Sequence, residues 1–198
     1  MPLVLCYDTE TTGLVNDREP PSHPSQPHLV QLGAVLLDEE SGTELGSVSL
    51  IVKPEGYAIP EQAAAVHHVT TGIATACGLP LVVVLALWSN LAKVAQHHVA
   101  HNAVFDLKVL QAEFHRVNRP FPPVDPRCTK QLAAPVLNLP PTPRMVAAGF
   151  TKPKDPTLTE CVRFFFDEDL VGAHGALADA RACGRVYLEL LRRGKVTS

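Results

Sequence analysis

The sequence predicts an α/β layered domain built around a mixed sheet, and three observations lead to this fold class. Residues 3–7 and 29–38 are apolar on both faces, which is typical of strands in the centre of a sheet. Three predicted strands come first along the chain, and helices and strands mix after them. The 198 residues are 46% hydrophobic, enough to bury the core of one large domain, so we assign residues 1–198 to a single domain.

The individual elements follow from the spacing of the apolar residues and from the residues that interrupt it. Short apolar runs predict strands at 3–7, 29–38, 47–54 and 98–102. Apolar residues spaced three and four apart predict helices at 59–69, 81–96, 103–117, 129–136, 158–166 and 175–193. Asn102 is expected to cap the helix that follows it, and Pro135 is expected to limit the helix that begins at residue 129.

Two proline-containing segments are expected to be loops. Residues 15–28 are polar with four prolines, and residues 138–157 carry five prolines together with Arg144, Lys152 and Lys154. Proline restricts the backbone, so the 15–28 loop should be stiff. It leaves the sheet directly after an acidic stretch, and we expect it to lie beside those acids.

Composition excludes several classes of protein. The formal net charge is −3, so a nucleic acid would have to be held by a local basic patch or through metal ions. No apolar run reaches the length of about 20 residues that spans a membrane, and the N-terminus lacks the features of a signal peptide. The five cysteines are odd in number and form no CxxC pair, which favours reduced thiols. We therefore expect a cytoplasmic protein that does not bind a membrane.

The first strand runs into two acids, Asp8 and Glu10. Because residues two apart on a strand point to the same side, the two carboxylates should face one way. Like charges about 4 Å apart repel by roughly 4 kcal/mol at an effective dielectric near 20, so a proton, a basic side chain or a divalent cation is needed to offset the repulsion. A solvated strand end with two acids is the alternative that this stretch alone leaves open.

Two further acids lie on predicted helices. Asp106 falls in the first turn of the helix at 103–117, beside its core-facing stripe, where stabilisation of the helix dipole is an alternative role. Asp179 shares a face with apolar residues of the last helix, so it should point inward and need a partner. His174 stands five residues before Asp179, just outside that helix.

The four acids come from three separate segments and could converge on a pair of hard divalent cations. Oxygen ligands with open positions suit Mg²⁺ or Mn²⁺. Two such ions stabilise both the attacking and the leaving oxygens in phosphoryl displacement. His174 could accept the proton of the attacking water.

Three short motifs resemble those of a known family. DTETTG (8–13), HNAVFD (101–106) and HGALADA (174–180) are similar to the three motifs of the DEDDh 3′→5′ exonucleases, the proofreading branch of the ribonuclease-H-like superfamily. The resemblance covers nearly the whole chain. It implies a ribonuclease-H-like fold, with a mixed five-stranded sheet flanked by helices in one domain.

The resemblance also implies roles for individual residues. Asp8, Glu10, Asp106 and Asp179 resemble the family's metal-binding acids, with Asp8 shared between two ions, and His174 resembles its general base. Segment 59–70 is similar to the family's segment that ends in a VHGIT loop, although His68 stands where the family has a glycine. The residues that would contact the terminal nucleotide or shape its pocket are Thr11, Thr12, Gly13, His67, Asn102 and Phe105.

These observations lead to one functional hypothesis and its alternatives. The chain is expected to be a metal-dependent 3′→5′ exonuclease that needs two Mg²⁺ or Mn²⁺ ions, acts on the 3′ end of a single-stranded or frayed nucleic acid, with DNA the expected substrate, and releases 5′-mononucleotides. The alternatives are a 3′→5′ exoribonuclease and a nucleic-acid-binding module that accompanies a polymerase. The chain ends soon after the last predicted helix, which favours a free-standing nuclease and leaves a polymerase or replication partner open. His97, His98 and His101 allow a zinc site as a weaker possibility.

Overall fold

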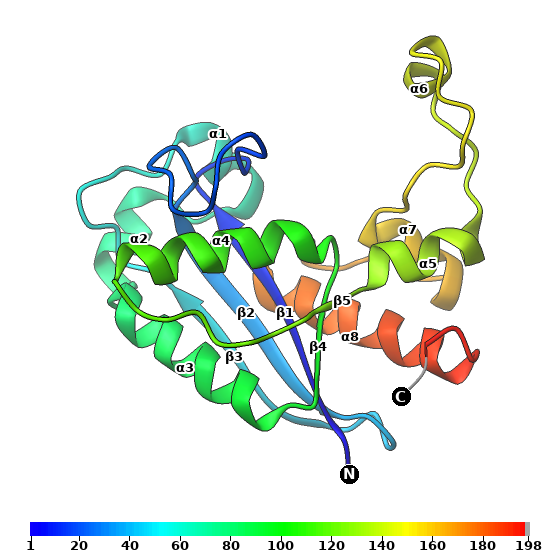
Figure 1. The fold of residues 1–198 in the computed structure, drawn as a ribbon, viewed down its shortest axis with the longest axis horizontal. Helices are drawn as coiled ribbons and strands as arrows, with labels where there is room; N and C mark the ends of the chain where they lie inside the picture. The colour runs from blue at the N-terminus through cyan, green and yellow to red at the C-terminus, as the bar shows by residue number, and fades with distance from the viewer. Residues whose placement is uncertain (197–198) are drawn as a thin grey trace.

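The computed structural model describes residues 1–196 (Figure 1). The strands are β1 Leu3–Thr11, β2 Leu29–Asp38, β3 Glu44–Ile51, β4 His97–Ala100 and β5 Arg127–Cys128. The helices are α1 Glu61–His67, α2 Thr71–Cys77, α3 Leu81–Val94, α4 Ala103–Arg116, α5 Thr129–Leu137, α6 Pro143–Ala147, α7 Leu158–Phe166 and α8 Ala176–Arg192.

The five strands form one mixed sheet in the order β3-β2-β1-β4-β5. Strands β1, β2 and β3 pair antiparallel, whereas β4 and β5 run parallel to β1. The expected mixed five-stranded sheet is therefore confirmed. β1 is its central strand, which explains why both of its faces are apolar.

Helices cover both faces of the sheet (Figure 1). Leu5 and Tyr7 of β1 point into a core shared with α3 and α4. Val4 and Cys6, on the opposite face of the same strand, pack in a core built with α5, α7 and α8. This alternation follows from the two-residue period of a strand and places the two helical layers on opposite sides of β1.

β1 extends further than the sequence predicts. The strand continues past Tyr7 to Thr11, because Asp8, Thr9 and Thr11 all pair with β2, with a register shift between Glu10 and Thr11. The acids therefore lie within the last four residues of the strand rather than after its end. Both carboxylates leave the strand on the α8 side, as the two-residue period requires.

Other element boundaries also differ from the predictions. α5 continues to Leu137 through Pro135, because a proline this close to the helix end costs one hydrogen bond while Leu137 is buried in the core. β3 begins at Glu44 rather than at residue 47; it is an edge strand with mostly exposed side chains, so the apolar pattern is weak there. α2 and the two-residue β5 were not predicted, since α2 buries only Ala74.

Asn102 does not act as the expected helix cap. Its backbone is left-handed (φ 72°) and its side chain makes no capping hydrogen bond. Its Oδ1 instead accepts a hydrogen bond from Lys130 Nζ, at 3.4 Å.

The two proline-containing segments are both ordered, and the second is not wholly a loop. Within 15–28 the buried side chain of Gln26 donates to three backbone carbonyls of the same loop, and Arg116 of α4 donates to the carbonyls of Gln26 and Pro27. The loop is thus fastened onto α4. The segment at 138–157 contains the short helix α6 and stands away from the rest of the molecule (Figure 1).

Membrane-spanning helices and disulfide bonds are both absent from residues 1–196. None of the helices in this part of the chain combines the length and hydrophobicity needed to cross a membrane. All five cysteines are free thiols.

Candidate active site

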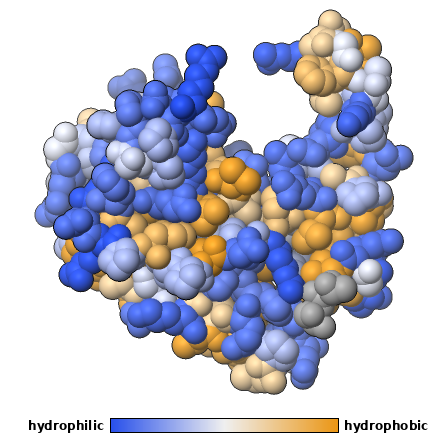
Figure 2. Space-filling view, viewed as in Figure 1, coloured by the Kyte–Doolittle hydropathy of each residue, from blue (hydrophilic) through white to orange (hydrophobic). Residues whose placement is uncertain are grey.

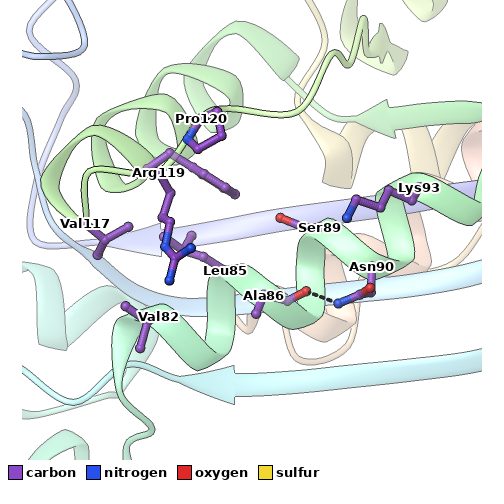
Figure 3. A pocket seen from close by; sticks show the side chains of 10 residues that line it. Val82, Leu85, Ala86, Ser89, Asn90, Lys93, Val117, Arg119 and Pro120 are labelled. Carbon is purple, nitrogen blue, oxygen red and sulfur yellow. Dashed lines mark hydrogen bonds between the residues drawn. The ribbon is translucent and has the colours of Figure 1, made fainter.

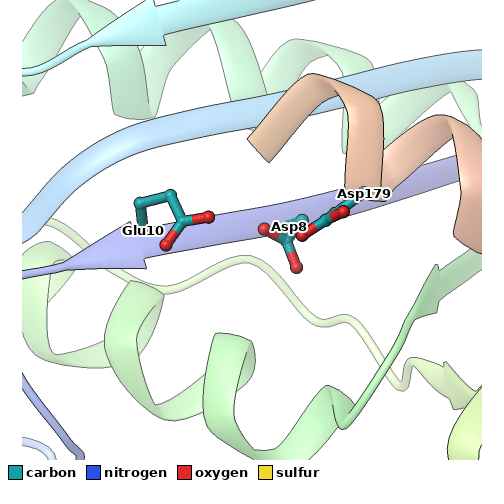
Figure 4. A group of neighbouring side chains, drawn as sticks. All are labelled: Asp8, Glu10 and Asp179. Atoms are coloured by element: carbon teal, nitrogen blue, oxygen red, sulfur yellow. The ribbon is translucent and has the colours of Figure 1, made fainter. Parts of the chain in front are cut away.

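Asp8, Glu10 and Asp179 come together at the centre of the sheet (Figure 4). One oxygen of each carboxylate lies within 4.8 Å of the other two. β1 supplies Asp8 and Glu10 from one face, and the first turn of α8 brings Asp179 over that same face. Two segments more than 160 residues apart in the chain therefore build one acidic cluster, as the motifs predict.

Asp106 lies next to this cluster but is held by a different contact. Its side chain is only 2% exposed, and its Oδ1 accepts hydrogen bonds from the backbone N–H (2.9 Å) and the hydroxyl (2.7 Å) of Thr9. Thr9 is the residue between Asp8 and Glu10, and it points to the α4 side of the sheet. The fourth acid is thus fastened to the strand that carries the first two.

The acids repel one another strongly. Burial, followed by the charges of Asp106, Asp179 and Glu10, raises the pKa of Asp8 well above its usual range. Burial and then the charges of Asp179 and Asp106 raise the pKa of Glu10 to about 7. Burial also raises the pKa of Asp106 to about 7, although the two hydrogen bonds from Thr9 oppose the rise.

No lysine or arginine offsets this charge: among residues 1–196 none of the four acids forms an ion pair with a basic side chain. Burial raises the pKa of Asp179, and its Oδ1 is buried without a hydrogen-bond partner. A buried carboxylate oxygen with no donor, beside two more carboxylates, is a good ligand for a divalent cation. The residues present therefore fit a site for hard cations.

His174 lies at the edge of the cluster in the turn before α8. Its backbone N–H donates to Asp179 Oδ2 at 3.1 Å, and its φ of 65° is in the left-handed region. The side chain is exposed and has no hydrogen bond or ion pair within the described part of the chain. The backbone thus fixes His174 to the acid while its imidazole stays free to turn toward a substrate.

A cavity of about 490 Å³ opens beside Glu10. Five of the six residues predicted to contact a nucleotide line it, namely Thr11, Thr12, Gly13, His67 and Phe105. Asn102 does not; it lines an adjoining cavity with the start of the 15–28 loop. The sequence analysis did not predict that Leu14 and Val66 line this cavity, although each directly adjoins a predicted site residue.

His67 lines this cavity with a buried side chain. Its side chain is 5% exposed, and its Nδ1 accepts a hydrogen bond from the N–H of Val69 at 3.1 Å. The proton of the neutral ring is therefore on Nε2, which is buried. Burial lowers the pKa of His67, which favours this neutral form, although interaction with the backbone of Thr11 opposes the shift. His67 thus packs against the segment that follows Glu10 and forms part of the cavity wall.

Two other places do not belong to this site. A cavity of about 350 Å³ lies between α3 and the end of α4, with Lys93 and Arg119 at its rim, and no predicted site residue lines it (Figure 3). The zinc alternative is wrong for the described residues, because the only candidate metal cluster among them is the acidic one. His98 contacts the carbonyl of Ala92, and His101 contacts Thr129 and Pro156, so these rings do not converge.

The sheet order and the central acidic cluster define a ribonuclease-H-like nuclease fold. The chain belongs to the exonuclease family: the family model RNase_T, described as Exonuclease, matches residues 5–187. This match confirms the exonuclease membership that the three motifs predict.

Solved structures of exonucleases share the fold at low sequence identity. E. coli Exonuclease I in complex with a dT13 oligonucleotide has a TM-score of 0.72 and 20% identity, over 95% of this chain and 40% of that chain. The zinc-bound E. coli ExoI–ssDNA complex has a TM-score of 0.73 and 19% identity, over 98% and 41%. The nuclease domain of 3′hExo, a DEDDh family member bound to rAMP, has a TM-score of 0.70 and 15% identity, over 97% and 92%.

The extent of these matches differs. The chain spans about two fifths of E. coli Exonuclease I but nearly the whole of the 3′hExo nuclease domain. No curated protein sequence matches the chain.

Proposed function

We propose that the chain is a divalent-cation-dependent 3′→5′ exonuclease that removes 5′-mononucleotides from the 3′ end of single-stranded or frayed DNA. The observation that carries the proposal is the cluster of Asp8, Glu10 and Asp179 within 4.8 Å, beside an open cavity lined by the residues that follow Glu10. Membership of the exonuclease family supports the same activity.

The acids would hold two Mg²⁺ or Mn²⁺ ions. Asp8, Glu10 and Asp179 offer oxygens from one cluster, and Asp106, whose charge acts on Asp8, would be the fourth ligand residue. The zinc-bound ExoI–ssDNA complex supports a divalent cation in this fold. When bound, the ions supply charge stabilisation for the attacking and leaving oxygens of the scissile phosphate.

The remaining steps belong to the protein's own side chains. The cavity beside Glu10, which Thr11 to Gly13 and Phe105 help to line, would receive the terminal nucleotide. His67, which lines the same cavity, would pack against the nucleotide. His174 would turn its imidazole toward the phosphate and accept the proton of the attacking water.

RNA is the second candidate substrate. The nuclease domain of 3′hExo is bound to rAMP and matches this chain over 92% of its own length, which favours an exoribonuclease as the second candidate. The complexes of ExoI with deoxyoligonucleotides favour DNA as the first. A polymerase or replication partner is not part of the proposal. The five free thiols support a reducing compartment such as the cytoplasm.

The test is hydrolysis of 5′-labelled single-stranded DNA, duplex DNA and RNA of one sequence, with Mg²⁺, with Mn²⁺ and with a chelator. We expect a ladder that shortens from the 3′ end, faster on single strands, and no cleavage with chelator. Asp8→Asn should lower the rate by at least about 10³-fold, because metal ions contribute several kcal/mol to such reactions. Asp125→Asn changes an exposed acid that is not a member of the cluster; it is the matched control and should be fully active. Metal-independent cleavage, or full activity of Asp8→Asn, would refute the proposal.

A further inference from the structure

Residues 140–153, here called the arm, project from the molecule between α5 and α7 (Figure 1). We propose that the arm is a second nucleic-acid-binding surface, which holds the single strand upstream of its 3′ end through Arg144, Lys152 and Phe150. The inference rests on the proposed function, because it assigns a path to the rest of the strand whose end enters the acidic site.

The arm is built as a rigid projection. At its base the N–H of Lys154 donates to the carbonyl of Leu139 at 3.1 Å, which closes the two ends of the segment together. Prolines at 140, 141 and 153 stiffen the stem on both sides. A rigid surface loses little conformational entropy when it binds a ligand, so this architecture favours binding.

The tip of the arm is shaped so that Phe150 is presented to solvent. Gly149 adopts a left-handed backbone (φ 82°) after α6, and the N–H of Phe150 donates to the carbonyl of Met145 at 2.9 Å. This is the helix-ending arrangement in which glycine is preferred. The turn places an aromatic ring at the tip, where it is 63% exposed, next to Val146, which is 56% exposed.

Among residues 1–196, Phe150 and Val146 of the arm are largely uncovered. No arm residue belongs to the three buried hydrophobic clusters of the described chain. Exposed aromatic rings are the usual platforms on which unpaired bases stack, and every base offers a face for stacking. An exposed phenylalanine on a rigid support therefore suits a single strand, whose bases are free, better than a duplex.

The charge of the arm is complementary to a polyanion. Arg144 and Lys152 are exposed, and neither forms an ion pair with any residue in 1–196. The other charges near the base are already neutralised, Lys154 by Glu160 at 2.5 Å and Asp155 by Lys130 at 3.6 Å. The arm thus carries two uncompensated positive charges on a chain whose net charge is −3. Free cations beside an exposed aromatic ring match phosphates and bases together.

The base of the arm is connected to the second motif of the active site. His101 Nε2 donates to the carbonyl of Pro156 at 3.3 Å, just beyond the arm. His101 is followed by Asn102 and then by α4, which carries Asp106. Figure 2 shows the arm separated from the body by an open notch, on the side of the molecule where α1 and the 15–28 loop also lie in Figure 1. A strand that leaves the acidic site through this notch would reach the arm.

The experiment compares short and long substrates in arm variants. We would measure kcat/KM with Mg²⁺ on a dinucleotide and on a single strand of about 20 nucleotides, long enough to pass several bases beyond the site. Binding of the long strand would be measured by fluorescence anisotropy with chelator at several salt concentrations. The variants are Arg144→Ala/Lys152→Ala, Phe150→Leu and Phe150→Trp, and the matched control is Lys93→Ala/Arg119→Ala on the distant cavity of Figure 3.

We expect the double arm variant to weaken binding of the long strand and to reduce the salt slope by about 1.4, because each lost phosphate contact accounts for about 0.7 on a single strand. Phe150→Leu should weaken binding at least about 5-fold, since it loses base stacking, whereas Phe150→Trp should bind as tightly as wild type. Activity on the dinucleotide, and the melting temperature, should be unchanged in all of them because the arm is exposed.

The outcomes separate the two proposals. If wild type hydrolyses both substrates and the arm variants bind the long strand with the wild-type affinity and salt slope, the inference about the arm is wrong and the proposed function stands. The same conclusion follows if Phe150→Leu binds like wild type, as expected for an arm that docks a protein by apolar contact. If wild type neither binds nor hydrolyses either substrate, both proposals fail.

Discussion

Gly33 of β2 and Ala176 at the start of α8 lie so close together that no side chain fits between them. A Cβ atom added to Gly33 would come within 2.1 Å of the carbonyl carbon of Ala176. Gly33 is the residue that pairs with Asp8 across the sheet, and Ala176 begins the helix that carries Asp179. This close approach is therefore what lets the two acids meet.

Gly33→Ala should push the start of α8 away from the sheet and separate Asp179 from Asp8. We expect a loss of stability of about 1–3 kcal/mol, the usual cost of overpacking, together with weaker binding of the divalent cation. Unfolding in urea and calorimetric titration with Mn²⁺ would measure the two effects. Gly46→Ala is the matched control, because a Cβ there meets nothing within 4 Å and Gly46 also lies on a strand of the same sheet. Equal Mn²⁺ affinity in both variants would show that this contact does not position Asp179.

The raised pKa values predict how the stability of the metal-free protein depends on pH. Glu10 and Asp106 have pKa values of about 7 in the folded protein, whereas carboxyls of the unfolded chain titrate near pH 4. Between about pH 4 and 7 the folded state holds more protons than the unfolded state, so these acids make the free energy of unfolding fall as pH rises.

Asp8→Asn removes one charge of the cluster and should reduce this fall. We expect the variant in chelator to gain on the order of 2 kcal/mol over wild type at pH 8 and to differ little from it at pH 4. Urea unfolding at both pH values tests this. Mg²⁺ should stabilise wild type at pH 8 more than it stabilises the variant. A variant that is less stable than wild type at pH 8 without metal would contradict the repulsion described for the cluster.

The hydroxyl of Thr9 should tune Asp106. Thr9→Val keeps the shape and the backbone donor but removes the 2.7 Å hydrogen bond, so the pKa of Asp106 should rise further. Protons should then compete more strongly with a cation for this carboxylate near pH 7. We expect a loss of about 10- to 100-fold in metal affinity or rate, as is usual for partners of ligand residues. Thr9→Ser retains the hydroxyl and should behave as wild type. Metal titrations of activity would reveal the difference, and a Thr9→Val enzyme with wild-type metal affinity would rule the role out.

His174 should matter for the rate and not for the binding of metal. Its contact with Asp179 is made by the backbone N–H, which remains when the side chain is changed. Asn tolerates the left-handed backbone at this position, so His174→Asn should fold well while lacking the base. We expect hydrolysis to slow by about 10²–10⁴-fold with Mn²⁺ affinity unchanged. If His174→Asn instead lost Mn²⁺ affinity as severely as Asp8→Asn, the imidazole would be a ligand.

The sequence by itself predicted the fold class, the order of the acids along the chain and the residues of the candidate site. The spacing of apolar residues predicted the central strands and the long helices, because this spacing reflects which side chains are buried. The two-residue period of a strand also placed Asp8 and Glu10 on one face. The three motifs marked Asp106, His174 and Asp179 because their spacing matches a family, without any knowledge of distances.

Only the tertiary structure decided how the acids are held and what surrounds them. Gly33 meets Ala176, and Thr9 donates to Asp106, so both contacts join segments that are distant in the sequence. The burial of His67 Nε2 also depends on how the chain packs. The sequence also could not predict the path of residues 138–157, because prolines predict an irregular segment but not its direction. Local patterns encode which face a residue buries, whereas contacts between segments arise only when the whole chain packs.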